Sequence, residues 1–280
     1  MEDSAEVEVP IGVYRLKVAT GFGPRVTGFR RVGGNEMFVR LEGVVIEHPD
    51  SGTYHLRGGH RLWAAPEIPA VTYAADDDPC EVEIGDCSCR VKGPVDRAGL
   101  AKEIVLAEAP IGVEVTHSIT NHNLHGVQIA AWAITQFPLG GTALLTLGGR
   151  EGVFRADRYL VTWPYTSFED PRLTWVDGGV QIRAEAGPRL KLGAGPRPGR
   201  IGYLNQGWLF MKHINDATGL DYPDFGAVGQ VFCDDASCEL ESVGPLVELA
   251  PGASTIHRET WSLWPCDEMS KVWERLRGEE

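Results

Sequence analysis

Short apolar segments separated by glycine and proline constrain the fold of this chain more than any other feature. The clearest segments are residues 112–120, 127–137 and 254–264, each flanked by proline or glycine. The 34 glycines and 18 prolines suit many strands joined by turns better than long helices. A helical pattern, with apolar residues on one face, occurs only at residues 267–277. We therefore predict an all-β sandwich or barrel with a short C-terminal helix.

The overall composition limits the classes of partner. The chain has no internal repeat, low-complexity tract or linker, so residues 1–280 are predicted to form a single domain. A net charge of −13 argues against nucleic acid or an anionic membrane as a partner. No window approaches the roughly 18 apolar residues of a membrane span. The first residues lack the pattern of a signal peptide, so we expect a cytoplasmic protein with mostly reduced cysteines.

Residues 58–67 bring an imidazole, a guanidinium, an indole and a carboxylate into one short segment. His60, Arg61 and Trp63 follow a pair of glycines, which permit unusual backbone conformations, and Pro66 stiffens the exit. Loops on a rigid scaffold often carry binding groups. We interpret the segment as a loop that contributes to a site. A surface turn whose indole covers the sheet edge is the alternative.

The predicted strand at residues 207–213 places an amine beside aromatic rings. A period of two puts Trp208, Phe210 and Lys212 on one face. Such a face could bind an anionic or hydroxylated ligand. Equally, the lysine stem could simply extend over an aromatic surface.

The predicted strand at residues 238–243 carries two carboxylates on one face, Glu239 and Glu241. If that face lines a cleft, repulsion and loss of solvent would raise the pKa of one carboxyl group. That group could then act as a general base. A solvated acidic face is the alternative.

Three histidines, His117, His122 and His125, could in principle supply a zinc site. Their spacing matches no common zinc signature, and the last two fall in a predicted hairpin turn. The chain also lacks the Gly-x-Ser-x-Gly, dinucleotide-binding and Walker motifs. We predict neither a metal nor a cofactor.

Several segments resemble galactose-mutarotase-like proteins, the aldose 1-epimerase superfamily. Residues 238–254 resemble their closing strands, and residues 23–26 with 33–35 resemble their opening strands. Residues 58–63 are similar to a Gly-Gly…Trp segment of the hexose-phosphate mutarotase branch, and residues 119–122 to a Thr-Asn hairpin. The resemblance covers most of the chain in order. It implies an antiparallel β-supersandwich whose concave sheet binds a sugar.

The resemblance also implies a reaction. In that family a glutamate near the C-terminus removes the proton of the anomeric hydroxyl, and a histidine protonates the ring oxygen. Glu241 matches the glutamate by position, but both histidine positions of the family hold other residues here. His60 or Lys212 would then have to serve as the acid. The other residues that we predict to bind substrate are Arg61, Trp63, Trp132, Trp208 and Glu239.

The resemblance thus implies an isomerase that interconverts anomers of a small carbohydrate or a related hydroxylated ring. One alternative is a carbohydrate-binding protein without catalytic activity, which the missing histidines would favour. Another is a proton-transfer enzyme that acts on a non-sugar substrate through Glu241 and Lys212.

Overall fold

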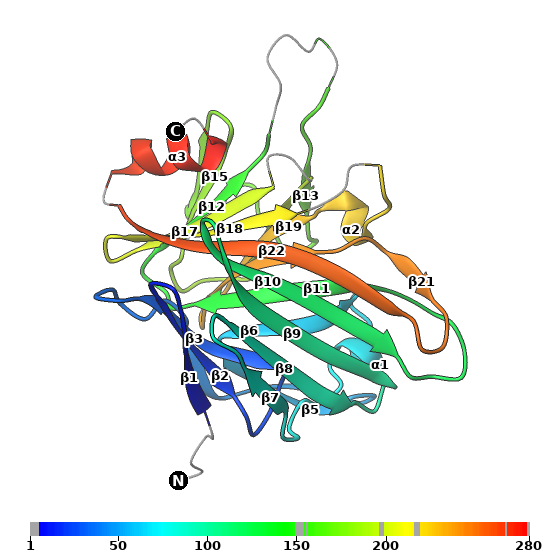
Figure 1. The fold of residues 1–280 in the computed structure, drawn as a ribbon. Coiled ribbons are helices and arrows are strands. Elements are labelled where there is room, and N and C mark those ends of the chain that lie inside the picture. Colours follow the sequence, from blue (N-terminus) through cyan, green and yellow to red (C-terminus); the bar gives the residue numbers. More distant parts are fainter. Residues whose placement is uncertain are drawn as a thin grey trace.

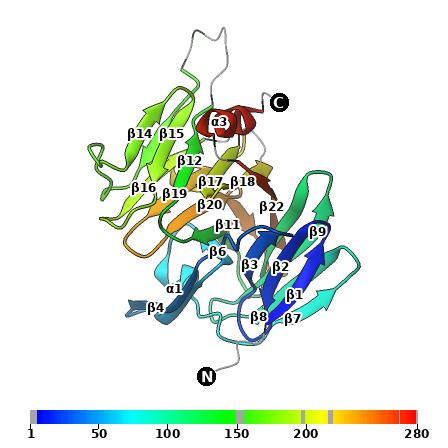
Figure 2. The same cartoon turned by 90° about the vertical axis from the view of Figure 1, so that its left-hand side faces the viewer.

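The computed structural model describes residues 6–148, 154, 156–195, 199–215, 219–266 and 268–278. In this part of the chain, the strands form two ten-stranded antiparallel sheets, packed face to face, and a separate two-stranded hairpin (Figure 1 and Figure 2). The predicted all-β supersandwich with a short C-terminal helix is confirmed. That residues 1–280 form one domain stays a prediction.

The first sheet contains the strands that carry most of the predicted site residues. Its strand order is β1-β2-β3-β6-β11-β20-β19-β16-β13, and β21 pairs with β11 outside this path. The strands are β1 (Glu6–Ile11), β2 (Tyr14–Ala19), β3 (Arg25–Arg31), β6 (His60–Ala65), β11 (Val127–Phe137), β13 (Leu160–Thr162), β16 (Leu190–Ala194), β19 (Gly229–Cys233), β20 (Cys238–Val243) and β21 (Val247–Leu249).

The second sheet packs against the inner side of the first. Its strand order is β14-β15-β12-β17-β18-β22-β10-β9-β8-β7. The strands are β7 (Glu81–Ile84), β8 (Ser88–Val95), β9 (Leu100–Ala109), β10 (Gly112–Asn121), β12 (Thr142–Thr146), β14 (Leu173–Val176), β15 (Gly179–Arg183), β17 (Arg200–Asn205), β18 (Trp208–Asn215) and β22 (Ser254–Pro265). The hairpin consists of β4 (Arg40–His48) and β5 (Gly52–Gly58).

The helices are few and short: α1 (Pro69–Thr72), α2 (Pro223–Gly226) and α3 (Met269–Arg277). The predicted C-terminal helix is α3, although residue 267 lies outside the described residues. Its apolar face, formed by Val272, Trp273 and Leu276, packs on the second sheet against Leu144 and Leu209. No helix in the described part of the chain has the length and apolar character needed to cross a membrane.

Alternation along the strands separates the core between the sheets from the outer sides of the sheets. In β11 and β20, Ala131, Phe137 and Leu240 enter the core shared by the two sheets, whereas Trp132 and Val243 belong to a separate cluster on the other side. A group of aromatic rings packs in the shared core with edge-to-face and tilted contacts. Its members are Phe29, Phe38, Phe137, Phe210 and Trp261.

Residues 58–67, predicted to be a loop, instead contain β6, which pairs with β3 and β11 in the first sheet. The preceding glycines both have positive φ, 79° at Gly58 and 72° at Gly59. A Cβ at Gly58 would lie 2.0 Å from the carbonyl oxygen of Val39, and one at Gly59 would lie 2.4 Å from that of Val26. The glycine pair therefore permits close approach to other backbone segments rather than forming a loop.

Candidate active site

The sequence-predicted residues that lie together occupy the outer face of the first sheet. We define this outer face as the side turned away from the second sheet, over β6, β11, β20, β19 and β16. The register pairs Ile134 of β11 with Arg61 on one side and with Glu241 on the other. Because side chains alternate along a strand, Arg61, Trp63, Trp132, Glu239 and Glu241 project from the same face. The predicted sharing of a face by the two glutamates is thus observed.

Glu241 is held by two donors. Its Oε2 accepts hydrogen bonds from Trp132 Nε1 at 2.7 Å and from Lys191 Nζ at 2.8 Å. The side chain is 1% exposed. Burial raises the pKa of Glu241 above its usual value, and the charge of Glu239 adds to this, although Lys191 and the hydrogen bonds act in the opposite direction. This carboxylate is therefore a stronger base than an ordinary surface glutamate.

Glu239 forms a second buried charge pair beside the first. Its Oε1 accepts from Gln136 Nε2 at 2.7 Å and from Arg61 Nη2 at 3.2 Å. The Arg61 guanidinium also lies over the Trp63 ring, with Cζ 4.1 Å from the ring centroid. Each carboxylate on the outer face thus has its own cation, which allows both to stay buried.

Aromatic rings surround these pairs. Trp63 and Trp132 meet edge to face, with centroids 5.5 Å apart. Lys191 Nζ lies 4.6 Å from the Trp132 ring centroid and 4.5 Å from that of Trp163. Tyr165 lies in the same loop as Trp163. Burial raises the pKa of its phenol, and the charges of Glu241 and Glu239 raise it further.

Several buried polar atoms on the outer face have no hydrogen-bond partner among the described residues. They are Arg61 Nε and Nη1, Trp63 Nε1, Gln136 Oε1 and Gln230 Oε1. An unpaired buried donor or acceptor is unfavourable, typically by about 1–3 kcal/mol. These atoms include both donors and acceptors, so a ligand with hydroxyl groups could satisfy them.

His60 lies on the opposite side of β6, in the interior between the sheets. Its Nδ1 is 2.9 Å from Thr135 Oγ1, and its Nε2 is 2.8 Å from His117 Nε2. His117 Nδ1 is 3.3 Å from the carbonyl oxygen of His257, which can only accept. This network assigns the proton of His117 to Nδ1, so that His117 Nε2 accepts from His60. Burial lowers the pKa of both imidazoles, that of His117 to about 4.

Lys212 belongs to the same interior network. Its Nζ lies 3.3 Å from Glu259 Oε2 and donates to the carbonyl oxygens of Leu240 and Ala133 at 3.2 and 3.4 Å. The side chains of Lys212 and Glu259 are both fully buried. Neither His60 nor Lys212 reaches the face that holds Glu241. Neither can therefore protonate a ligand bound there, in contrast to the acid role inferred from the sequence.

Trp208 is also remote from the outer face. It lies in the second sheet, packs against the edge of the shared core, and a Cβ at Gly34 would lie 3.0 Å from its ring. Its predicted alignment with Phe210 and Lys212 is observed, because all three point toward the core. The structure thus places Trp208 with the core and not with the predicted substrate-binding residues.

The histidines considered for zinc are not gathered. His117 is buried in the interior, whereas His122 and His125 are exposed in the turn between β10 and β11. A different set, His60, His117 and Glu259, has ligand atoms within 4.8 Å of one another. The imidazoles already hydrogen-bond to each other, and Lys212 already compensates the charge of Glu259. A metal ion there would be repelled by that ammonium group. The absence of a metal site stays a prediction.

Sequence reasoning missed Lys191, Trp163, Tyr165, Gln136 and Gln230. Residues 150–200 are rich in glycine, proline and arginine, and their strands are too short to stand out. One sequence feature could have indicated Lys191. It lies between Leu190 and Leu192, and this alternation of apolar and polar residues is typical of a strand with one polar face.

No protein-family model and no curated protein sequence matches the chain. Solved structures do match its fold. A galactose mutarotase-like protein from Lactobacillus casei has 10% identity and a TM-score of 0.58, over 93% of this chain and 100% of that one. A putative aldose 1-epimerase from Escherichia coli has 13% identity and a TM-score of 0.55, over 93% and 99% of the two chains.

A putative mutarotase from Salmonella typhimurium has 9% identity and a TM-score of 0.59, over 95% of this chain and 92% of that one. The likeness therefore spans nearly the whole of both chains in each case. The hexose-phosphate branch stays a prediction. At these identities the comparisons establish the fold alone, and this protein is built on the galactose-mutarotase-like β-sandwich.

Proposed function

We propose that this protein interconverts the anomers of a sugar or sugar derivative at the outer face, as an isomerase of the aldose 1-epimerase type. Glu241 carries the proposal, because it is a buried carboxylate whose pKa is raised and whose position is fixed by Trp132 and Lys191. A general base works best when its pKa lies near the working pH. The fold shared with mutarotase-like proteins supports the assignment.

The surroundings of Glu241 favour a hydroxylated ligand over an apolar one. The unpartnered atoms of Arg61, Gln136 and Gln230 require both acceptors and donors, and sugar hydroxyl groups supply both. The indoles of Trp63 and Trp132 offer apolar surface for the C–H groups of a ring. This combination argues against the proton-transfer alternative on an apolar substrate.

Ligand binding requires movement, because Glu241 is only 1% exposed. The side chains near its carboxylate that come from outside β11 and β20 include Lys191, Gln230 and Tyr165. Tyr165 is itself 43% exposed. We therefore expect Tyr165 or Lys191 to shift when a ligand binds, which protein-observed NMR with and without sugar would detect.

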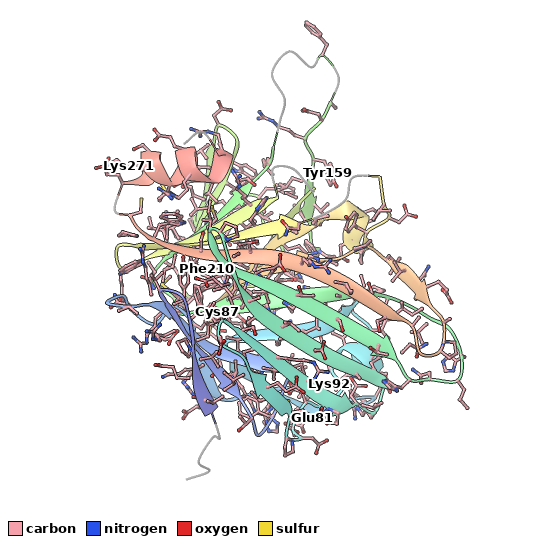
Figure 3. The ribbon with its side chains drawn as sticks, in the orientation of Figure 1. Glu81, Cys87, Lys92, Tyr159, Phe210 and Lys271 are labelled. Carbon is pink, nitrogen blue, oxygen red and sulfur yellow. The ribbon has the colours of Figure 1, made fainter. Side chains whose placement is uncertain are left out.

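The test is an anomer-exchange NMR experiment on a panel of aldoses and aldose phosphates. The wild-type protein should accelerate exchange for at least one sugar, and E241Q should lower kcat by about 10²- to 10⁴-fold with little change in ligand affinity. E81Q is the matched control, because Glu81 lies on β7 at the far edge of the second sheet and is exposed (Figure 3). An E241Q protein that exchanges anomers at the wild-type rate would contradict the proposal.

Sugar binding without chemistry is the second candidate. The observation that favours it is the closed ion pair between Lys191 and Glu241, which leaves the carboxylate both neutralised and covered. In that case a sugar would raise the melting temperature of the protein without accelerating anomer exchange. Both quantities can be measured on the same samples.

A further inference from the structure

Opening a hemiacetal ring requires an acid as well as a base. The base takes the proton of the anomeric hydroxyl while the bond between the anomeric carbon and the ring oxygen breaks, and that oxygen must gain a proton. Both oxygens are bonded to one carbon, so the acid and the base must lie within a few ångströms of each other. The acid must therefore be sought beside Glu241, on the outer face.

Lys191 meets this requirement. Its ammonium group is 2.8 Å from Glu241 Oε2 and is flanked by the rings of Trp132 and Trp163. The backbone of Lys191 is fixed by Thr166, whose Oγ1 accepts from the Lys191 N–H at 3.0 Å and donates to its carbonyl oxygen at 2.8 Å. The side chain is 5% exposed, so its direction is set by packing. Ammonium and carboxylate are thus presented together from β16 and β20.

The other donors at this face are poorer acids. The guanidinium of Arg61 does not release a proton in proteins, and the indole of Trp132 is a donor only. Burial and nearby carboxylates raise the pKa of Tyr165, so its phenol gives up a proton less readily than usual. His60 is sealed in the interior.

We propose that Lys191 is the general acid of this site, paired with Glu241 as the base; the inference rests on the proposed function. Glu241 takes the proton from the anomeric hydroxyl, and Lys191 gives a proton to the ring oxygen as the carbon–oxygen bond breaks. The products are the open-chain aldehyde, a neutral amine and a protonated carboxyl group. After rotation about the bond next to the aldehyde carbon, the ring oxygen attacks the other face of the carbonyl carbon. Its proton returns to Lys191, and that of Glu241 returns to the anomeric oxygen, so atoms and charges balance.

The test compares K191R and K191M with the wild type on the sugar identified by the exchange assay. Arginine keeps the positive charge and the contact with the indoles but does not release a proton, so K191R isolates proton donation from electrostatics. We expect both variants to lose about 10²- to 10⁴-fold in kcat with KM changed only a few-fold.

K271M is the matched control, because Lys271 is exposed on α3, which packs on the second sheet and not on the outer face of the first (Figure 3). Near-ultraviolet circular dichroism establishes which Lys191 variants retain the native fold. A folded K191R separates proton donation from charge, whereas a folded K191M tests only whether the ammonium group is needed. If the wild type is active, E241Q is impaired and the folded Lys191 variants keep wild-type kcat, the role of Lys191 is refuted while the proposed function stands. If the wild type accelerates exchange of no sugar in the panel, both are refuted.

Discussion

Replacing Lys212 with methionine should destabilise the protein through a single neighbouring carboxylate. The substitution keeps the length and apolar character of the stem but removes the ammonium group, 3.3 Å from Glu259 Oε2 in a site with no solvent exposure. Glu259 would then be a buried charge without its cation. Lys212 also donates to the carbonyl oxygens of Ala133 and Leu240, so K212M removes those contacts as well.

The expected cost follows from what remains around Glu259. Breaking a buried ion pair by removing one partner typically costs about 3–5 kcal/mol. Glu259 would keep the hydrogen bonds from Ser242 Oγ at 2.5 Å and Trp261 Nε1 at 2.6 Å, which favours the lower end of this range. We therefore expect K212M to lower the free energy of unfolding at pH 7 by about 3 kcal/mol. This corresponds to a fall in Tm of roughly 5–10 °C.

The pH dependence of this cost has a definite sign. In the wild type the pKa of Glu259 is lowered, because Lys212 and the nearby histidines outweigh burial. The group then adds stability above its unfolded pKa and loses it as the pH falls. In K212M burial should raise that pKa, so the group adds stability at low pH and loses it as the pH rises. The difference between K212M and the wild type should therefore shrink from pH 7 toward pH 4.5.

Urea unfolding of both proteins at several pH values measures this difference, and a K212M/E259Q double variant supplies the control. Removing both charges leaves no uncompensated ion, so the double variant should recover most of the lost stability. If K212M alone does not fold, recovery of folding in the double variant carries the same information. A K212M protein within 1 kcal/mol of the wild type at pH 7 would refute the reasoning, as would a cost that grows with acidification.

Two further predictions concern the interior histidines and the outer face. Burial lowers the pKa of His60, His117 and His257, so each stays neutral in the fold while the unfolded chain takes up protons below about pH 6.5. The free energy of unfolding should be greatest above that pH and fall steeply between about pH 6.5 and 4, with His117 alone contributing about 3 kcal/mol. Urea unfolding at several pH values measures this, and a free energy of unfolding that stays constant over this range would contradict the prediction. R61M should weaken sugar binding about 10- to 100-fold, because a charged hydrogen-bond donor is worth about 1.5–3 kcal/mol. Isothermal titration calorimetry measures the affinity for the sugar, with R183M as the control because Arg183 is exposed. Equal affinities of R61M and the wild type would rule out a role for Arg61 in binding.

The strands that could be predicted from sequence are those with long, uninterrupted patterns. Residues 127–137 and 238–243 match β11 and β20 because apolar runs and clear turns bound them. The sequence pattern predicted the wrong local structure where close contacts with distant backbone required a particular residue type. The glycines before β6 suggest a loop, although they are required by contacts with Val39 and Val26, which are distant in sequence. Likewise Val71, Thr72 and Tyr73 are residue types typical of a strand, yet Val71 and Thr72 lie in α1, which begins at Pro69.

Only part of the candidate site could be predicted from the sequence. A period of two placed Glu239 and Glu241 on one face, and this needs only local information. That Lys191 lies beside Glu241 depends on the order β20-β19-β16, in which a strand from a distant part of the chain is placed second from β20. The expectation that His60 lies at the site was wrong because residues 58–67 were predicted to be a loop. Once the segment is known to be the strand β6, alternation places His60 on the face opposite Arg61.

Two lysine–glutamate pairs, one on each side of the first sheet, differ in their surroundings. Inside, Glu259 faces Lys212 and two imidazoles and accepts from Ser242 and Trp261, and its pKa is lowered. Outside, Glu241 has Lys191 and one indole donor but lies near the negative Glu239, and its pKa is raised. The same two residue types thus form a charged pair with a lowered carboxyl pKa inside and a pair with a raised carboxyl pKa outside. Environments that drive equivalent groups in opposite directions are typical of separate structural and catalytic roles, and this contrast supports the proposal that the proton chemistry takes place at the outer pair.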